Sequence, residues 1–122
     1  MKTLKNKPFS RWLKSEKISD IKLLEAIEEI ERGLIDAELG GNVLKKRIPL
    51  GNKGKSKGAR TILAFKTADR AVFMHGFSKK DTDNITKEEL KSLKKLAQHY
   101  FNLTEKELTK AIKVGILIEV KK

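Results

Sequence analysis

The feature that most constrains the fold is a change of apolar pattern at the Gly40-Gly41 pair. Before this pair, apolar residues recur at every third position: Ile18, Ile21, Leu24, Ile27 and Ile30, with Leu34 following. This spacing predicts one amphipathic helix over residues 19–32. Ser19 is its expected N-cap, and Gly33 supplies the left-handed residue that ends it.

Beyond the glycine pair the period shortens to two. In NVLKKRIPL the side chains alternate between two faces of a predicted strand: Val43, Lys45 and Arg47 on one, Leu44, Lys46 and Ile48 on the other. Residues 61–65 (TILAF) and 71–77 (AVFMHGF) are two further β-rich runs, joined by a turn at residues 67–70. Because the connections are too short for helical crossovers, these strands predict an antiparallel sheet.

The rest of the chain is predicted to be helical until its last residues. Two capping boxes each open a helix: Thr86 with Glu89, and Thr104 with Glu107. The closing segment GILIEV predicts a final strand or an extended segment that covers the core. The expected fold class is α+β, a small antiparallel β-sheet with packed helices, and 122 residues predict a single domain over residues 1–122.

Charge is distributed unevenly along the sequence. The formal net charge is +12, yet residues 20–38 hold seven acids against two bases. Residues 41–66 hold eight bases and no acid. A solvent face ordinarily mixes both signs, so this local absence of acids predicts that the basic segment binds a polyanion, and nucleic acid is the commonest one.

The basic residues of the predicted sheet come from three separate segments. Lys45 and Arg47 point the same way from one strand, Arg60 begins the next, and Lys79-Lys80 follow the third. If the strands are neighbours, these side chains converge on one face. Further RNA-binding side chains are expected in the same region: Lys46, the loop lysines Lys53, Lys55 and Lys57, and His75.

His75 and the aromatic residues each admit two interpretations. His75 is expected to share a strand face with Phe73 and Phe77, where it either packs beside the rings or takes part in proton transfer. Trp12 lies next to basic residues, a setting that suits base stacking. With few aromatics in the chain, we expect Trp12 to belong to the core instead.

Three familiar ligand sites are not predicted. GNKGKS has the end of a Walker A motif, but Pro49 stands where its first glycine belongs and a strand follows the loop. DTDNITKEEL lacks the third oxygen ligand and the glycine of a calcium loop. The two histidines share no ligand spacing and cysteine is absent, so we expect no metal and no cofactor. No apolar run approaches the ~18 residues of a membrane span, and a cytoplasmic location is expected.

Four spaced elements occur in a specific order: Leu-Gly-Gly at residues 39–41, Lys-x-Arg at 45–47, Gly-Lys-Ser-x-Gly-x-Arg at 54–60 and Phe-x-Lys at 77–79. Together with FSRW at residues 9–12, they resemble the RelE/HigB group of toxins from bacterial type II toxin–antitoxin systems, within the RelE/ParE superfamily. The similarity runs from Phe9 to Val120. It implies a RelE-like ribonuclease toxin fold and a metal-independent endoribonuclease, or mRNA interferase, that cleaves mRNA on the ribosome.

The resemblance also implies which residues act. Catalytic basic positions of the group match Lys45, Arg47, Arg60 and the pair Lys79-Lys80. A tyrosine often follows that basic pair in RelE-type enzymes, whereas this chain has Asp-Asn-Ile-Thr at residues 83–86. The implied partners are mRNA, the ribosome and a cognate antitoxin, expected to be a small helix-turn-helix protein.

Metal-independent RNA cleavage assigns a task to each of these residues. Arg60, assisted by Arg47, suits the crowded phosphorane because a guanidinium contacts two phosphate oxygens at once. Lys45 is the expected general base, since like charges nearby favour the neutral amine. Lys80 or Lys79 is the expected general acid, with His75 as the substitute.

Two other functions stay open from the sequence. A nucleic-acid-binding module without catalysis explains the charge and the missing tyrosine. A ParE-like toxin directed at DNA gyrase keeps the fold and does not require the basic cluster. The antitoxin is expected either to present acidic residues to the basic face or to wrap the helix around residues 18–34.

Overall fold

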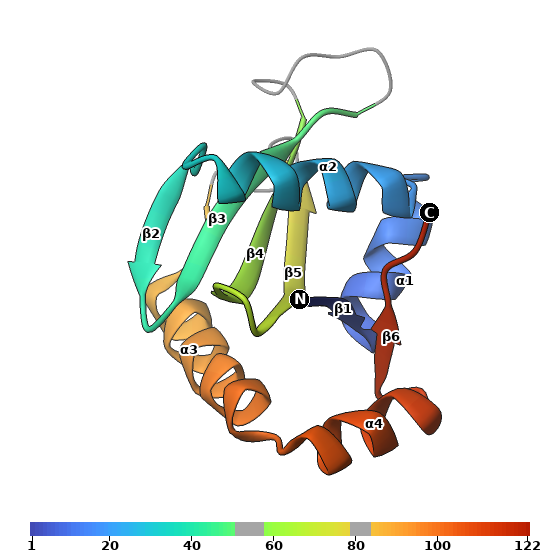
Figure 1. Cartoon of the computed structure of the whole chain (residues 1–122). Coiled ribbons are helices and arrows are strands. Elements are labelled where there is room, and N and C mark those ends of the chain that lie inside the picture. The colour runs from blue at the N-terminus through green and yellow to red at the C-terminus, as the bar shows by residue number, and fades with distance from the viewer. Residues whose placement is uncertain (51–57, 79–83) are drawn as a thin grey trace.

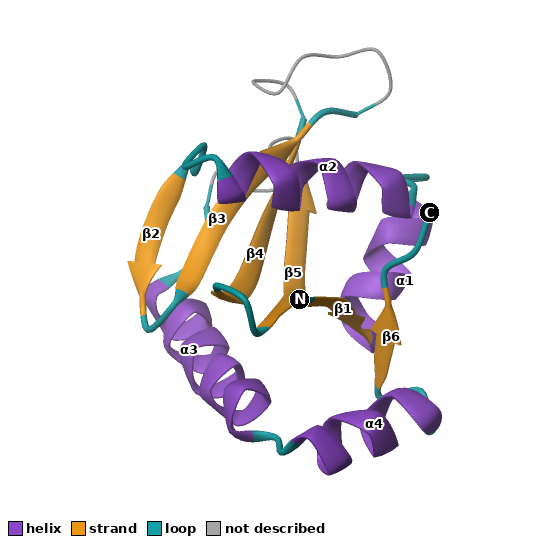
Figure 2. Cartoon of the chain, in the orientation of Figure 1, coloured by secondary structure: helices purple, strands orange, loops and turns teal. Residues whose placement is uncertain are grey.

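The computed structural model describes residues 1–50, 58–78 and 84–122. Figure 1 and Figure 2 show the elements along these ranges, which are, in order, β1 (Lys2–Asn6), α1 (Lys7–Ser15), α2 (Asp20–Glu31), β2 (Ala37–Gly40), β3 (Val43–Ile48), β4 (Ala59–Lys66), β5 (Arg70–Ser78), α3 (Lys87–Asn102), α4 (Glu105–Lys113) and β6 (Leu117–Glu119). The strands form one sheet in the order β2-β3-β4-β5-β1-β6. All described pairs are antiparallel except β1 with β5. The predicted α+β class is confirmed.

The central strands pair as the sequence predicts. In the register of β3 with β4, Lys45 faces Ile62 and Arg47 faces Arg60. β4 and β5 form the expected hairpin, in which Ile62 faces His75 and Arg60 faces Phe77. Residues opposite each other in a ladder project to the same side of the sheet. Two rows of side chains therefore cross all three strands.

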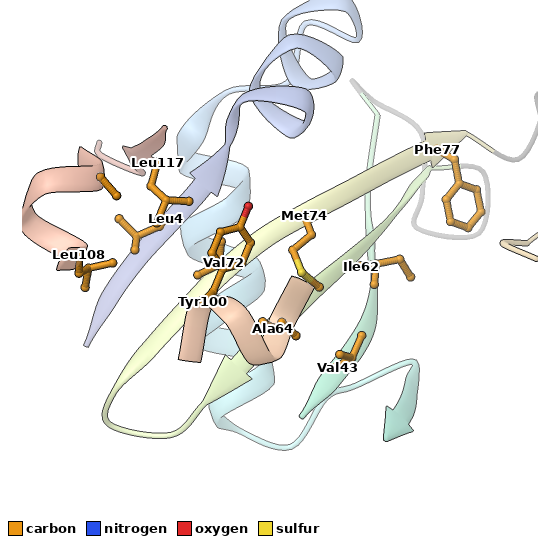
Figure 3. Packing of buried hydrophobic residues seen from close by; sticks show 12 residues of the cluster. Leu4, Val43, Ile62, Ala64, Val72, Met74, Phe77, Tyr100, Leu108 and Leu117 are labelled. Atoms are coloured by element: carbon orange, nitrogen blue, oxygen red, sulfur yellow. The ribbon is translucent and has the colours of Figure 1, made fainter. Parts of the chain in front are cut away.

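Each face of the sheet is covered by its own layer of helices. On one face Val43, Ala64 and Val72 pack with residues of α3 and α4, including Tyr100 and Leu108 (Figure 3). The other face packs against α1 and α2 through a second cluster that includes Phe9, Leu23, Ile27, Leu44, Leu63 and Phe73. We call the first side the α3 face and the second the α2 face.

The α2 helix is present, but its buried stripe differs from the predicted one. It spans Asp20–Glu31, and Gly33 has the expected positive φ of 87°. Its buried residues are Leu23, Ala26, Ile27 and Ile30, whereas Ile21 and Leu34 are each 52% exposed. A three-residue spacing falls short of the 3.6-residue turn, so the predicted stripe drifts around the helix instead of staying on the sheet.

Sequence patterns did not reveal three elements: the inner strand β1, the helix α1 and the edge strand β2. β1 inserts between β5 and β6, so segments from both ends of the chain meet in one sheet. Asn6 ends β1 and caps α1, accepting a hydrogen bond from the Phe9 N–H at 2.9 Å. Lys5 is buried and pairs at 2.6 Å with Asp20, at the start of α2. Such long-range partners leave no periodic signal in a short strand.

The α1 helix carries Trp12 onto the α2 face. Trp12 lies 5.4 Å from the ring of Phe9 and packs against the second core cluster. A Cβ atom added to Gly76 of β5 would overlap its indole ring. The expectation that Trp12 belongs to the core is confirmed, and Gly76 is the residue that makes room for it.

Both predicted capping boxes are formed. Glu107 accepts a hydrogen bond from the Thr104 N–H at 2.9 Å, and the Glu107 N–H donates to the Thr104 hydroxyl at 3.1 Å. The equivalent bonds join Thr86 and Glu89 at the start of α3. In each box the pKa of the glutamate lies below its ordinary value. The hydrogen bond from the threonine N–H is the larger cause, and the interaction with the threonine side chain is the smaller one.

Candidate nucleic-acid interface

The basic residues of β3 and β4 share the α3 face. One row across the three strands on this face is Lys45, Ile62 and His75, of which Ile62 is buried in the cluster that includes α3 residues. The next row is Arg47, Arg60 and Phe77. The predicted convergence is thus confirmed for Lys45, Arg47 and Arg60. Adjacent strands lie about 4.8 Å apart, so phosphate contacts from these residues fall within one small area.

Arg60 sits at the centre of the second row and is only 6% exposed. Its Nη1 donates to the Gly58 carbonyl oxygen at 3.1 Å, which fixes the guanidinium on the strand that carries it. Among the described residues it forms no ion pair. A guanidinium has five N–H donors, and this hydrogen bond uses one of them.

Asp36, which directly precedes the edge strand β2, contacts Arg47 of the neighbouring strand β3. Its Oδ2 accepts a hydrogen bond from the Arg47 N–H at 2.7 Å, and its Oδ1 lies 3.7 Å from Arg47 Nε. The Asp36 N–H also donates to the Lys45 carbonyl oxygen at 3.2 Å. Nε of Arg47 is buried without a hydrogen bond to any described residue, although 41% of the side chain is exposed. Sequence analysis missed Asp36, because its role depends on where β2 begins beside β3.

Lys45 and Lys46 lie on opposite faces. Lys45 is half-buried on the α3 face, where its ammonium group makes no ion pair with a described residue. Lys46 is 3% exposed beneath α2, and its Nζ lies 2.7 Å from Glu29 and 2.8 Å from the Leu34 carbonyl oxygen. Lys46 was predicted to bind RNA with Lys45, but the structure places it on the opposite face with its charge already paired inside the protein.

His75 shares the α3 face with Phe77 but not with Phe73. A register shift in the β4–β5 ladder pairs Ile62 with His75 and the next residue, Leu63, with Phe73. The extra residue in β5 turns Phe73 into the α2-face core, so the prediction of one shared aromatic face is corrected by this bulge. The rings of His75 and Phe77 lie 5.9 Å apart.

An open pocket of about 310 Å³ adjoins His75. It is lined by His75 from β5 and by four residues from the first two turns of α3: Glu88, Glu89, Ser92 and Leu93. A single sequence does not reveal this pocket, because the α3 residues follow an ordinary capping pattern.

The remaining predicted site residues lie outside the described ranges. They are Lys53, Lys55 and Lys57 of the glycine-rich loop, and Lys79 and Lys80 after β5.

The position of Tyr100 bears on whether a tyrosine could take part in catalysis. Tyr100, the one tyrosine in the sequence, is buried in α3, and its hydroxyl accepts a 3.3 Å hydrogen bond from Asn6 Nδ2. Burial raises the pKa of this phenol, which is far along the helix from the basic rows.

In the described part of the chain, no cluster of histidine and carboxylate side chains could hold a metal ion.

None of the helices in the described ranges combines the length and the apolar character that crossing a membrane requires.

Comparison with known proteins agrees with this geometry. The model of the family described as the RelE toxin of the RelE/RelB toxin–antitoxin system matches residues 1–120. No curated protein matches the chain. The matched residues include the central sheet, the helices on both faces and the basic rows. The chain belongs to the RelE toxin family, and it is the toxin of a pair whose other member is an antitoxin.

Proposed function

We propose that this toxin is a metal-independent endoribonuclease that cleaves mRNA on the ribosome, in the manner of the RelE and HigB toxins, and acts in the cytoplasm. The observation that carries the proposal is the row in which Arg47 lies opposite Arg60, next to the row that holds Lys45. Three cationic side chains from two paired strands lie on one face of the sheet. That arrangement suits charge stabilisation at a phosphodiester.

The proposed reaction uses the RNA as its own nucleophile. Lys45 takes the proton of a ribose 2′-hydroxyl, and the 2′-oxygen attacks the adjacent phosphorus. Arg60 and Arg47 bind the non-bridging oxygens, on which negative charge accumulates in the phosphorane. The bond from phosphorus to the 5′-oxygen then breaks, and that oxygen receives a proton from Lys80 or Lys79. The products are a 2′,3′-cyclic phosphate and a 5′-hydroxyl end.

Cleavage of a message on purified translating ribosomes tests the proposal. Primer extension should detect cuts with wild-type toxin, and the 5′ ends should carry hydroxyl groups. Arg60→Lys keeps the charge but loses the planar fork, so we expect cleavage to fall about 10²-fold. Arg47→Ala should lose activity while keeping the fold, because its side chain is partly exposed. Arg32→Ala, an exposed arginine at the end of α2, is the matched control.

The buried hydroxyl of Tyr100 favours one competing function, an RNA-binding module without catalysis. That protein would bind ribosomes or message and leave the RNA intact at every enzyme concentration. A ParE-like toxin would instead leave message intact and inhibit DNA supercoiling by gyrase. Wild-type cleavage by Arg60→Lys, measured on correctly folded protein, would remove Arg60 from the mechanism.

For the antitoxin, we propose a small helix-turn-helix protein that covers the α3 face with acidic side chains. The described part of this face offers Lys45, Arg47 and Arg60 without an ion pair that neutralises all three. Charge complementarity of this kind speeds association and weakens with salt. Antitoxin and RNA should therefore compete, and RNA should fail to bind the preformed complex.

A further inference from the structure

The pocket beside His75 differs in charge from the basic rows that it adjoins. Lys45, Ile62 and His75 form one row, so the imidazole lies two strand spacings, or roughly 10 Å, from Lys45 along the same face. The α3 helix supplies the opposite wall through Glu88 and Glu89. If one phosphate of an RNA strand contacts Lys45 and Arg60, a neighbouring phosphate or base of the same strand can thus reach the pocket.

The chemistry of the pocket excludes a phosphate. Two carboxylates on its wall repel an anion, and among its lining residues only His75 can carry positive charge. A nucleobase is uncharged and carries N–H donors, so this lining suits a base better than a phosphate. The His75 ring and the Leu93 side chain offer faces on which a base can stack, and a carboxylate accepts hydrogen bonds from base N–H groups.

Of the two carboxylates, Glu88 is the one available to a ligand. Glu89 already accepts the Thr86 N–H at 2.9 Å through its capping box. Glu88 is exposed and lines the pocket, and Ser92 lies four residues further along the same helix face. Carboxylate and hydroxyl therefore stand side by side, opposite the imidazole.

We propose that this pocket is a nucleobase site, in which a base stacks on His75 and its exocyclic amino group donates to Glu88. The inference rests on the proposed function, because it assigns the base next to the bound phosphate. Adenine, guanine and cytosine carry an exocyclic amino group. Uracil has a single ring N–H between two carbonyl oxygens that the carboxylate repels. The site should therefore disfavour uracil at one position of the message.

Two measurements test the site. In the first, cut positions are mapped on messages with every base at each position near the cut. Wild-type toxin should discriminate against uracil at one position by about 10-fold, and Glu88→Gln should reduce this discrimination to near unity. His75→Ala should lower cleavage about 10-fold, and His75→Phe should restore it through stacking. Glu28→Gln, an exposed acid on α2, makes the same charge change away from the pocket and should leave the base profile intact.

The second measurement needs no catalysis. Titration with CMP or UMP, followed by NMR of the His75 ring protons, should give larger shifts and tighter binding for CMP, and Glu88→Gln should remove the difference. If no message is cleaved but this CMP preference persists, the endoribonuclease proposal fails and the base site stands. If the toxin cleaves with an unchanged base profile in Glu88→Gln, and His75 responds equally to both nucleotides, the base site is overturned.

Discussion

Arg47 of β3 and Arg60 of β4 are direct register partners, so two guanidinium groups arise from neighbouring positions on one face of the sheet. Like charges directly opposite each other destabilise an antiparallel pair. Asp36 offsets this repulsion in part, from 3.7 Å beside Arg47 Nε. An anion between the two groups would offset the remaining repulsion, and under the proposed function a phosphodiester would be that anion.

The first prediction concerns stabilisation by RNA. A short RNA at a hundred times its dissociation constant should stabilise the toxin by about 2.7 kcal/mol. Arg47→Gln removes charge-assisted hydrogen bonds to phosphate, each of which contributes about 1.5–3 kcal/mol. At the same RNA concentration the increase in melting temperature should mostly disappear. Thermal unfolding with and without RNA measures both effects, and an equal increase in the two proteins would contradict the assignment.

The second prediction uses two adjacent lysines as matched variants. Lys45→Met should leave stability nearly unchanged and reduce the salt dependence of RNA binding, with the log–log slope falling by about 0.7 for one lost phosphate contact. Lys46→Met removes an almost fully buried ammonium group that lies 2.7 Å from Glu29 and donates to the Leu34 carbonyl oxygen at 2.8 Å. It should cost on the order of 3 kcal/mol of unfolding free energy.

Urea unfolding and RNA titration at several salt concentrations separate the two lysines. In the Lys46 variant the salt slope should equal that of the wild type. A reduced slope there, or a large loss of stability in Lys45→Met, would show that the two faces are wrongly assigned.

The third prediction tests the packing of Trp12 on Gly76. Gly76→Ala places a methyl group in the space of the indole ring, and overpacking of this kind should cost about 2 kcal/mol. In a Trp12→Leu background the same substitution should cost much less, because the ring is gone. A double-mutant cycle from urea unfolding gives the coupling. Equal costs in the two backgrounds would mean that the indole does not occupy this position.

The fourth prediction concerns pH. The Thr104 N–H lowers the pKa of Glu107 in the folded state, so this glutamate stabilises the protein fully above its unfolded pKa of about 4.3. That contribution is lost as pH falls through the folded-state pKa. Glu107→Gln should therefore be less stable than wild type at pH 6 and nearly equal to it at pH 3. Glu28→Gln controls for the charge change, and a stability difference independent of pH would rule out this linkage.

Local signals were enough to predict much of the fold. Both capping boxes, the glycine that ends α2 and the alternation of β3 depend on residues within about four positions of each other. The same alternation predicted that Lys45 and Arg47 share a face, and the strand order was simple enough to bring Arg60 beside them. For this reason the basic rows of the candidate site were within reach of the sequence.

Features that depend on residues far apart in the chain could not be predicted from the sequence. Lys46 is as basic as Lys45, and only the packing of α2 against β3 determines which of them is buried with Glu29. The bulge in β5 separates Phe73 from His75, although strict alternation joins them.

The sequence by itself determined the period of each element, its caps and the side of the strand to which each charge belongs, because these follow from backbone geometry over a few residues. The tertiary structure decided which helices cover each face of the sheet, how Asp36 holds Arg47, and that α3 and His75 line an open pocket. Those outcomes depend on burial and charge pairing between segments far apart in the chain. The free energies of such interactions cannot be predicted from a local sequence pattern.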